Sequence, residues 1–367
     1  MPSPPIAVLL TYLNIFSSLI HDTKTHQEAA MQTEQMSHKN RIMKIMFEKW
    51  ISKPLYIAAE LGIADLLENG AMAVDDLAEK TGTDPELLYR IMRALAAVAI
   101  FEERENRSFA LNSASELLQK HALQSTAIMF HAPWNDRAWS RLLDTLRSGT
   151  PAFQIAHGMP LSGWLNTHAK AASVFNEANA QKAAGLGRQI AAGYDFSRIS
   201  RIADIGGGTG LCAMEILSVH SHLKATVVDL PAVIEQTKAA ITRRSLETRC
   251  KAETGDMFTS IPAGSDCCLL ANILHDWPDE ACIAILKNCS AAMNKETTLL
   301  IAEMIIPERP GFSLSKLLDL EMMVMTGGRE RTEPEYRALL LRAGMNVSRI
   351  IHLKDDWCLI ETVRSGE

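Results

Sequence analysis

The chain has 367 residues, of which 47% are hydrophobic and 22% charged, so it is long enough for two domains that each bury a core. Its formal net charge is -6 and its lysines and arginines form no run, which argues against nucleic acid or an anionic membrane as a partner. The seven cysteines show neither a Cys-x-x-Cys pair nor a zinc-type array with histidine, so we expect reduced thiols and a cytoplasmic location.

Near its start the chain carries an apolar segment, residues 6–20, that lacks the basic region of a signal peptide and is short for a membrane span. We expect this segment to form a helical arm that packs against a second subunit. Alternatively, it lies upstream of the true start, because Met31 and Met36 are candidate initiators. With the polar stretch that follows, it forms a predicted arm and linker over residues 1–40.

Residues 41–124 carry apolar side chains at three- and four-residue spacing, which predicts helices. Two short helices around a turn at residues 81–85 precede a hairpin-like segment, FEERENRSFALN, so we expect a winged-helix outline. The second helix of the pair carries only Arg90 and Arg93 as cations among apolar residues. An N-terminal helical, winged-helix-like dimerisation domain is therefore favoured over a domain that binds DNA.

Helical patterns continue over residues 125–198, where aromatic and methionine side chains recur. We interpret this region as a connector whose aromatic residues are mostly core and which contributes to a substrate pocket. Over residues 199–367 short apolar strands alternate with helices, which predicts an α/β domain with a Rossmann-like, doubly wound and mostly parallel sheet. In such a fold the ligand binds at the rim where the strands end.

The first strand of this sheet leads into a glycine-rich loop, DIGGGTG, which begins at Asp204. Its glycines let backbone N–H groups approach a carboxylate or phosphate closely. A dinucleotide fingerprint would need glycine at the position of Leu211, and no lysine follows to complete a P-loop. Asp204, Gly206 and Gly208 are therefore candidate ligands of a cofactor other than a nicotinamide dinucleotide.

Carboxylates and apolar side chains also follow the next two strands. Asp229 and Leu230 end the second strand, where the carboxylate of Asp229 is placed to bind both hydroxyls of a ribose. Asp256, Met257 and Phe258 follow the third strand and offer an acceptor for an adenine amino group beside an apolar surface. Singly, each is equally well explained as a capping aspartate or a core methionine. At three successive strand ends they predict a cofactor with adenosine, a carboxylate-bearing tail and no phosphate, which is S-adenosylmethionine.

A histidine and two glutamates occupy the same predicted rim. His275 follows the fourth strand, Glu303 ends the fifth, and Glu330 lies in the segment GGRERT. A histidine with an ordinary pKa of about 6.5 is suited to remove the proton of a phenol, and either glutamate would hold the ring in its proton-accepting tautomer. His275 is alternatively a turn cap, and Glu330 an ordinary ion pair with a flanking arginine. Without an Asp/Asn cluster for a divalent metal, the predicted reaction is metal-independent.

Six motifs, DIGGGTG, VVDLP, GDMF, LHDWPDE, IAEMIIP and GGRERT, occur in an order and spacing that resemble one family. From Arg41 to its C-terminus the chain resembles the class II, plant-type small-molecule O-methyltransferases, which include caffeic acid and hydroxyindole O-methyltransferases. One position departs from the plant members, which usually carry a lysine four residues before the catalytic histidine. That position is Ala271 here.

The resemblance implies that His275 is the general base, that Glu303 and Glu330 bracket it, and that the glycine loop and the following strand ends bind S-adenosylmethionine. It also implies an intertwined homodimer formed through the N-terminal region. The acceptor is expected to lie against that region and two helices, which contribute Phe175, Asn179, Met322 and Met325.

Other activities are compatible with these motifs. Relatives of the same fold methylate carbon or nitrogen, or use the bound cofactor for hydroxylation or decarboxylation. A second alternative is a winged-helix regulator that senses S-adenosylmethionine, which the low basic content of the predicted recognition helix disfavours. The apolar, methionine-rich wall favours an aromatic, polyketide-like or phenazine-like hydroxyl compound as the acceptor.

Overall fold

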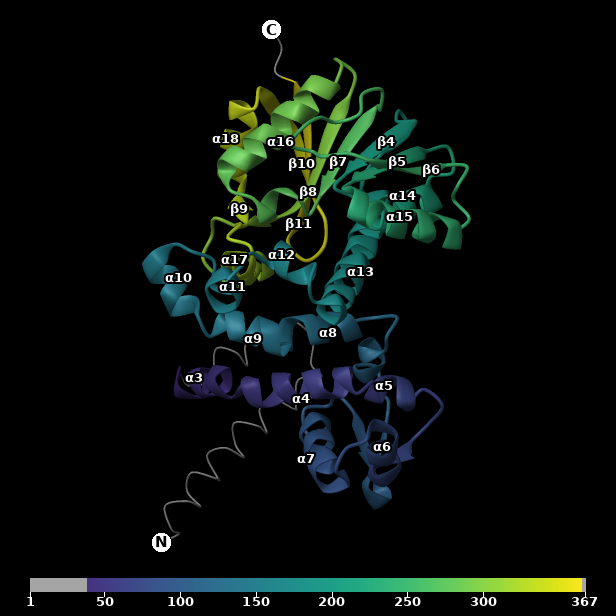
Figure 1. Ribbon diagram of the computed structural model, residues 1–367, viewed down its shortest axis with the longest axis vertical. Coiled ribbons are helices and arrows are strands. Elements are labelled where there is room, and N and C mark those ends of the chain that lie inside the picture. Colours follow the sequence, from purple (N-terminus) through teal and green to yellow (C-terminus); the bar gives the residue numbers. More distant parts are fainter. Residues whose placement is uncertain (1–37, 365–367) are drawn as a thin grey trace. The chain divides into compact units, whose positions relative to one another are not determined.

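The computed structural model describes residues 38–364 (Figure 1). They divide into two compact units, one ending at Ala132 and the other beginning at Pro133. The expected helical arm at residues 6–20 lies outside the described residues, and the domain limits at residues 40, 124 and 198 stay predictions. Over the described part of the chain, no helix combines the length and the apolar character that crossing a membrane requires.

The N-terminal unit is mainly helical and carries a small sheet. Its helices, including two 3₁₀ turns, are α3 (His38–Phe47), α4 (Lys49–Glu60), α5 (Ile63–Leu66), α6 (Val74–Thr81), α7 (Pro85–Ala96), η1 (Glu105–Arg107), η2 (Ser115–Leu118) and α8 (Gln124–His131). Its strands are β1 (Met72–Ala73), β2 (Glu102–Arg104) and β3 (Ser108–Ala110).

The predicted helix-turn-helix and hairpin are both present in this unit. Helix α7 begins at Pro85 because the Asp84 side chain accepts a hydrogen bond from Leu87 N at 2.9 Å and the proline fixes a helical φ. Strands β2 and β3 pair antiparallel, which confirms the hairpin, and β1 adds a third strand that the sequence did not predict. Met92 of α7 and Phe109 of β3 are fully buried in one core that joins helices and wing.

The C-terminal unit contains a large mixed sheet with helices on both faces. Its helices are α9 (Pro133–Trp139), α10 (Leu142–Ser148), α11 (Ala152–His157), α12 (Leu161–Leu165), α13 (Ala169–Gly193), α14 (Leu211–Val219), α15 (Pro231–Arg243), η3 (Leu274–Asp276), α16 (Asp279–Ala292), α17 (Leu314–Met325) and α18 (Glu333–Arg342). Its strands are β4 (Arg201–Ile205), β5 (Lys224–Asp229), β6 (Cys250–Thr254), β7 (Cys267–Ala271), β8 (Thr298–Ile306), β9 (Arg331–Thr332), β10 (Met345–His352) and β11 (Trp357–Arg364).

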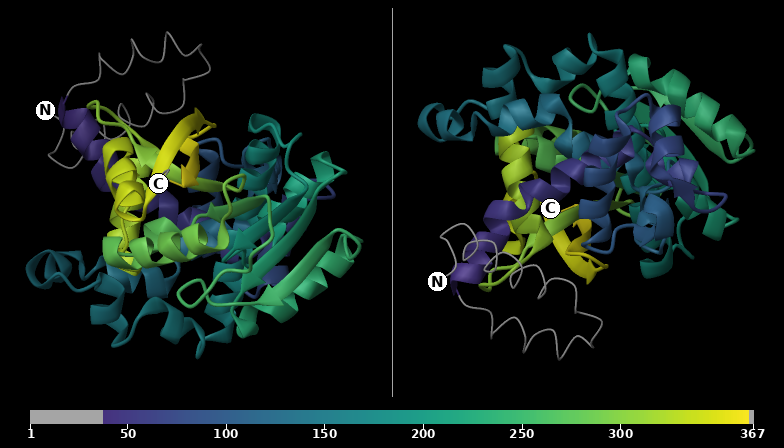
Figure 2. Two further views of the ribbon diagram at one scale, coloured as in Figure 1. Left: turned by 90° about the horizontal axis from the view of Figure 1, so that it is seen from above. Right: turned by 90° about the horizontal axis from the view of Figure 1, so that it is seen from below.

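The strand order is β10-β11-β8-β7-β4-β5-β6, with β4 to β8 parallel and β11 antiparallel to both its neighbours. Helices α13, α14 and α15 cover one face and α16 and α18 the other, as Figure 2 shows from two directions. Because side chains alternate along a strand, Ile202 packs into the core under α13, α14 and α15, and its neighbour Ala203 packs into the core under α16 and α18. This arrangement confirms the predicted fold class.

Strand β4 lies between β5 and β7, so the chain winds one way from β4 to β6 and then returns to the other side of β4. In parallel α/β sheets the crevice at such a reversal, outside the carboxyl ends of the strands, is the usual ligand site. The glycine-rich loop follows β4 and therefore lies at this switch point. All seven cysteines are buried and unbridged, and Cys267 and Cys268 lie in β7.

Candidate functional site

The glycine-rich loop after β4 needs glycine at consecutive positions for two different reasons. Gly206 and Gly208 have φ values of +68° and +57°, a left-handed conformation that side chains disfavour. At Gly207 an added Cβ would lie 2.5 Å from Asp204 Oδ2, so a side chain has no room. The loop is held in place by Asp229, whose Oδ2 accepts a hydrogen bond from Gly208 N at 2.8 Å.

Asp204 lies at the end of β4 with no exposed surface, and neither carboxylate oxygen has a hydrogen-bond partner among the described residues. Burial, together with the charge of Asp229, raises the pKa of Asp204 to about 7. Buried carboxylate oxygens normally accept hydrogen bonds. Asp204 therefore has unused acceptor capacity beside the glycine loop, and its contact with the cofactor stays a prediction.

The other two strand ends converge on this loop. Asp229 holds Gly208, as described, and its Oδ1 accepts a hydrogen bond from Leu230 N at 2.7 Å. A Cβ at Gly206 would lie 3.8 Å from Met257 Sδ, so the third strand end also borders the loop. A carboxylate oxygen has more than one lone pair, so Asp229 can accept further hydrogen bonds, and its binding of ribose hydroxyls stays a prediction.

Asp256 and Phe258 form the outer part of the predicted adenosine site. Asp256 Oδ1 accepts from Phe258 N at 2.9 Å, so this carboxylate does cap its own turn, as the alternative interpretation expected. Phe258 is 38% exposed, and its ring packs edge-on against Trp277 with centroids 4.8 Å apart. Carboxylates and an aromatic surface fit a cofactor with an amino group, ribose hydroxyls and no phosphate, as S-adenosylmethionine has.

His275 lies in the 3₁₀ turn that follows β7 and is only 3% exposed. Its Nδ1 is 2.8 Å from Glu330 Oε1 and 3.6 Å from Glu303 Oε2, so the hydrogen bond goes to Glu330. A carboxylate at this distance favours the tautomer with the proton on Nδ1. Nε2 is then left as the proton acceptor.

Glu303 supports the histidine through the backbone. It lies inside β8, which continues to Ile306 rather than ending at Glu303 as expected, and it is beside the end of β7 because Ala302 is in register with Ala271. Its Oε1 accepts hydrogen bonds from Ile273 N at 2.9 Å and Leu274 N at 2.7 Å, which fixes the turn that carries His275. Burial raises the pKa of Glu303, while the neighbouring His275 lowers it.

The structure decides between the two interpretations of Glu330. Arg329 pairs with Glu335 and Arg331 pairs with Asp279, so neither flanking arginine binds Glu330. The backbone N–H of Glu330 donates to Asp319 Oδ1 at 2.9 Å, which anchors this segment to α17. Glu330 is therefore free to accept from His275.

Arg331 is a supporting residue that the sequence analysis missed. It is 1% exposed, and it donates to Leu274 O and Trp277 O, each at 2.9 Å, and to Asp279 Oδ1 at 2.7 Å. These acceptors lie on both sides of His275 in the chain, so one guanidinium group holds both ends of the turn. In the sequence, the only indication of this role is that Arg331 is next to Glu330, and such a neighbour by itself indicates only an exposed ion pair.

Opposing effects act on the pKa of His275. Burial lowers it, but the charges of Glu303 and Asp276 and the hydrogen bond to Glu330 outweigh burial and raise the pKa to about 9. Among the described residues, His275, Glu303 and Glu330 also have the spacing of potential metal ligands. Metal independence therefore stays a prediction.

Two of the four predicted acceptor-binding residues pack in one aromatic cluster, and the other two lie outside it. Phe175 and Met325 pack in one aromatic cluster together with Phe153, although Met325 is only 5% exposed. The Asn179 amide donates back to Phe175 O at 3.0 Å, and Met322 is half-buried on α17. The structure thus joins Phe175 with Met325, and the role of all four residues in binding stays a prediction.

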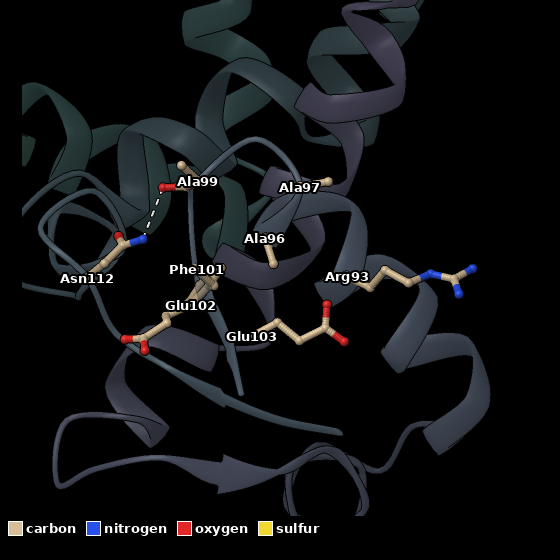
Figure 3. Close-up of a pocket in the computed structure, with 8 residues that line it drawn as sticks. All are labelled: Arg93, Ala96, Ala97, Ala99, Phe101, Glu102, Glu103 and Asn112. Carbon is tan, nitrogen blue, oxygen red and sulfur yellow. Dashed lines mark hydrogen bonds between the residues drawn. The ribbon is translucent and has the colours of Figure 1, made fainter. Parts of the chain in front are cut away.

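A separate groove lies on the N-terminal unit (Figure 3). Asn112 Nδ2 donates to Ala99 O across one end at 3.0 Å. Its lining is Arg93, Ala96, Ala97, Ala99, Phe101, Glu102, Glu103 and Asn112. None of the predicted site residues lines this groove, since all of them lie in the C-terminal unit.

Two family models match the chain. One, described as an O-methyltransferase domain, matches residues 139–346, and the other, described as an O-methyltransferase dimerisation domain, matches residues 43–121. A curated relative, the mitomycin biosynthesis 6-O-methyltransferase of Streptomyces lavendulae, is 36% identical over 306 residues, which cover 82% of this chain and 87% of the relative.

A second relative, the 8-amino-8-demethylriboflavin N,N-dimethyltransferase of Streptomyces davaonensis, is 32% identical over 84% of this chain and 90% of its own length. A solved O-methyltransferase from neocarzinostatin biosynthesis, in complex with S-adenosylmethionine and 2-hydroxy-5-methyl naphthoic acid, aligns with a TM-score of 0.72 at 25% identity. That alignment covers 85% of this chain and 95% of the other. The chain therefore belongs to the family of S-adenosylmethionine-dependent small-molecule O-methyltransferases, as its motifs indicated.

Proposed function

We propose that the protein methylates a hydroxyl group of a small aromatic or polyketide-like acceptor, without a metal ion, and that His275 is the general base. The observation that carries the proposal is the hydrogen bond from His275 Nδ1 to Glu330, which leaves Nε2 as a proton acceptor. The turn around His275 also borders the cofactor residues on two sides. Ile273 Cδ1 would lie 2.7 Å from a Cβ at Gly206, and Trp277 packs on Phe258.

The cofactor supplies an electrophilic methyl group on a sulfonium centre. His275 Nε2 accepts the hydroxyl proton as the acceptor oxygen forms its new bond to carbon. Glu330 stabilises the resulting imidazolium, and Glu303 keeps the turn in position through Ile273 and Leu274. The carbon–sulfur bond breaks in the same step, so the products are the methyl ether, S-adenosylhomocysteine and one proton on His275.

The direct test is to incubate the protein with S-adenosylmethionine labelled in its methyl group and a panel of phenols and hydroxyquinones, with and without EDTA. Mass spectrometry should find the label on an acceptor oxygen in both samples. Loss of transfer in EDTA that added metal restores would make the three clustered side chains a metal site. Label on nitrogen would favour N-methylation, the second candidate, since one relative is an N,N-dimethyltransferase.

Cofactor affinity should depend on Asp229. Substituting Asp229→Asn removes the charge that accepts from Gly208 N and Leu230 N, and we expect S-adenosylhomocysteine to bind at least about tenfold more weakly by calorimetry. Asp266→Asn is the matched control, because this carboxylate accepts from Ser200 N and Arg201 N at the amino end of β4, away from the glycine loop. Equal weakening in both variants would contradict a specific role for Asp229.

The pH profile should report the raised pKa of His275. Only the neutral imidazole accepts a proton, so kcat/KM should rise with pH and level off above about 9, the pKa of His275 in the free protein. Glu330→Gln removes a negative charge that favours the imidazolium, so the rising limb should move to lower pH. If the rising part of the kcat/KM profile stayed at the same pH in this variant, the profile would report the titration of a group other than His275.

The dimerisation domain also supports a homodimer. Helix α3 and the start of α4 expose Ile42, Ile45, Met46 and Trp50, each more than half accessible. Ile45 and Met46 follow Ile42 by three and four residues, and Trp50 follows Met46 by four. Such a stripe normally packs against another surface. Light scattering should give a dimer mass for the unmodified protein and a monomer mass for the double variant Ile45→Glu, Met46→Glu. A monomer without any substitution would contradict the proposal.

A further inference from the structure

A polar cluster lies beside the aromatic residues of the C-terminal unit and has no part in the mechanism above. Glu321 of α17 accepts two hydrogen bonds from α9, one from Asn135 Nδ2 at 2.8 Å and one from Trp139 Nε1 at 2.7 Å. Both donors are neutral, and among the described residues no lysine or arginine forms an ion pair with this carboxylate. Burial raises the pKa of Glu321, and the two hydrogen bonds oppose that effect.

Asn135 leaves a buried acceptor unused. Its side chain has no exposed surface, and its Oδ1 has no hydrogen-bond partner among the described residues. Turning the amide over would place Oδ1 2.8 Å from a carboxylate oxygen of Glu321, where two acceptors repel. The hydrogen bond to Glu321 therefore fixes the amide with Oδ1 unsatisfied, whereas a purely structural bridge between two helices normally satisfies its buried polar atoms.

The cluster adjoins residues predicted to bind the acceptor. Trp139 packs in the same aromatic cluster as Phe175 and Met325. Glu321 lies one helical turn before Met325, on the helix that leads into the segment of Glu330. In that segment, Arg329 N donates to His275 O at 2.8 Å, which joins the segment to the turn of the proposed base.

We propose that Asn135 and Glu321 form a subsite for a hydrogen-bond donor on the acceptor molecule, an aromatic amine or a second hydroxyl. The proposal rests on the proposed methyl transfer and names the substrate class for it. Asn135 Oδ1 and the remaining lone pairs of the carboxylate are all acceptors, so the occupant must bring the protons. A negative, partly desolvated carboxylate favours an N–H donor over an ether or carbonyl oxygen, which it repels.

The test uses calorimetry to measure the binding of naphthols to the full chain saturated with S-adenosylhomocysteine. The compounds are an unsubstituted naphthol, a series of aminonaphthols that differ in the position of the amine, and the matching methoxynaphthols. At least one aminonaphthol should bind about tenfold more tightly than the naphthol, and its methoxy counterpart more weakly. Equal binding of all three kinds of compound would overturn the proposal, since it would mean that an ordered water rather than the acceptor molecule donates to Asn135 Oδ1.

Three variants separate recognition from a structural role. Asn135→Leu removes the unsatisfied acceptor, and Glu321→Gln replaces the carboxylate with an amide that donates, so both should abolish the preference for the amine. Trp139→Phe is the matched control, because it removes a donor to Glu321 and leaves both acceptors, so the preference should persist. A preference that survives in Glu321→Gln, whose shape is nearly unchanged, would contradict the subsite.

Methyl transfer to the same compounds is measured in parallel and tests the proposed function separately. Selective binding of an aminonaphthol without transfer from S-adenosylmethionine to any of the compounds would count against the proposed reaction and leave the subsite supported. Transfer that does not discriminate between amine and methoxy compounds would support the reaction and overturn the subsite.

Discussion

Replacing His275 with alanine should lower kcat for methyl transfer by about 10²–10⁴-fold, the usual contribution of a positioned general base. The imidazole is buried and bound to Glu330 at Nδ1, and the neighbouring Ile273 and Trp277 border the candidate cofactor residues Gly206 and Phe258. Its loss removes the proton acceptor and leaves the glycine loop untouched. We therefore expect the affinity for S-adenosylhomocysteine, measured by calorimetry, to change little.

The control for this substitution is His222→Ala. His222 is an exposed histidine whose Nε2 contacts Phe196 O, outside the site. This variant should retain full transfer. If the His275 variant kept a rate within a few-fold of the original across the pH range, the assignment of the base would be wrong. A joint loss of transfer and cofactor binding would instead indicate that His275 holds the site together.

Arg331→Met should reduce the free energy of unfolding by roughly 3 kcal/mol or more, because it removes the charged donor from Leu274 O and Trp277 O and each hydrogen bond to a charged group contributes about 1.5–3 kcal/mol. The donors that remain to these two carbonyls are the weak Cys282 thiol and, for Leu274 O, the long contact from Trp277 N at 3.3 Å. In a unit of this size a loss of roughly 3 kcal/mol corresponds to a fall in Tm of roughly 6–12 °C in a thermal melt. The turn that carries His275 should also loosen, so kcat should fall in the surviving folded protein.

The adjacent Arg329 provides a matched control for this prediction. Arg329 and Glu335 form an exposed ion pair, which contributes about 0–1 kcal/mol. Arg329→Met should therefore shift Tm by no more than a few degrees, although both substitutions remove one arginine from the same segment. Equal shifts in the two variants would show that Arg331 has no special supporting role.

Much of the catalytic domain was predictable from local signals. The alternation of apolar strands with helices predicted the parallel sheet, and the positions of Asp204, Asp229 and Asp256 after successive strands placed them at one rim. The small sheet of the N-terminal unit was only partly predicted, because β1 is two residues long and leaves no periodic pattern.

Individual interactions were less predictable where a residue had several possible partners. Glu330 was open to an ion pair with Arg329 or Arg331, and the structure shows that both arginines pair elsewhere. Asp256 was open to a turn cap or a cofactor contact, and the structure shows the cap while leaving free lone pairs on the carboxylate. Sequence spacing identifies such residues as candidates, and their geometry in the folded chain decides between the interpretations.

The family, the cofactor and the candidate base were all predictable from the sequence, because they depend on short motifs whose residues are neighbours in the chain. The folded chain was needed to show that His275 contacts Glu330, that Arg331 holds both ends of the turn around His275, and that Asn135 contacts Glu321. These partners lie 55, 57 and 186 residues apart. Contacts across such separations depend on the order of strands and the packing of helices, which leave no local pattern in the sequence.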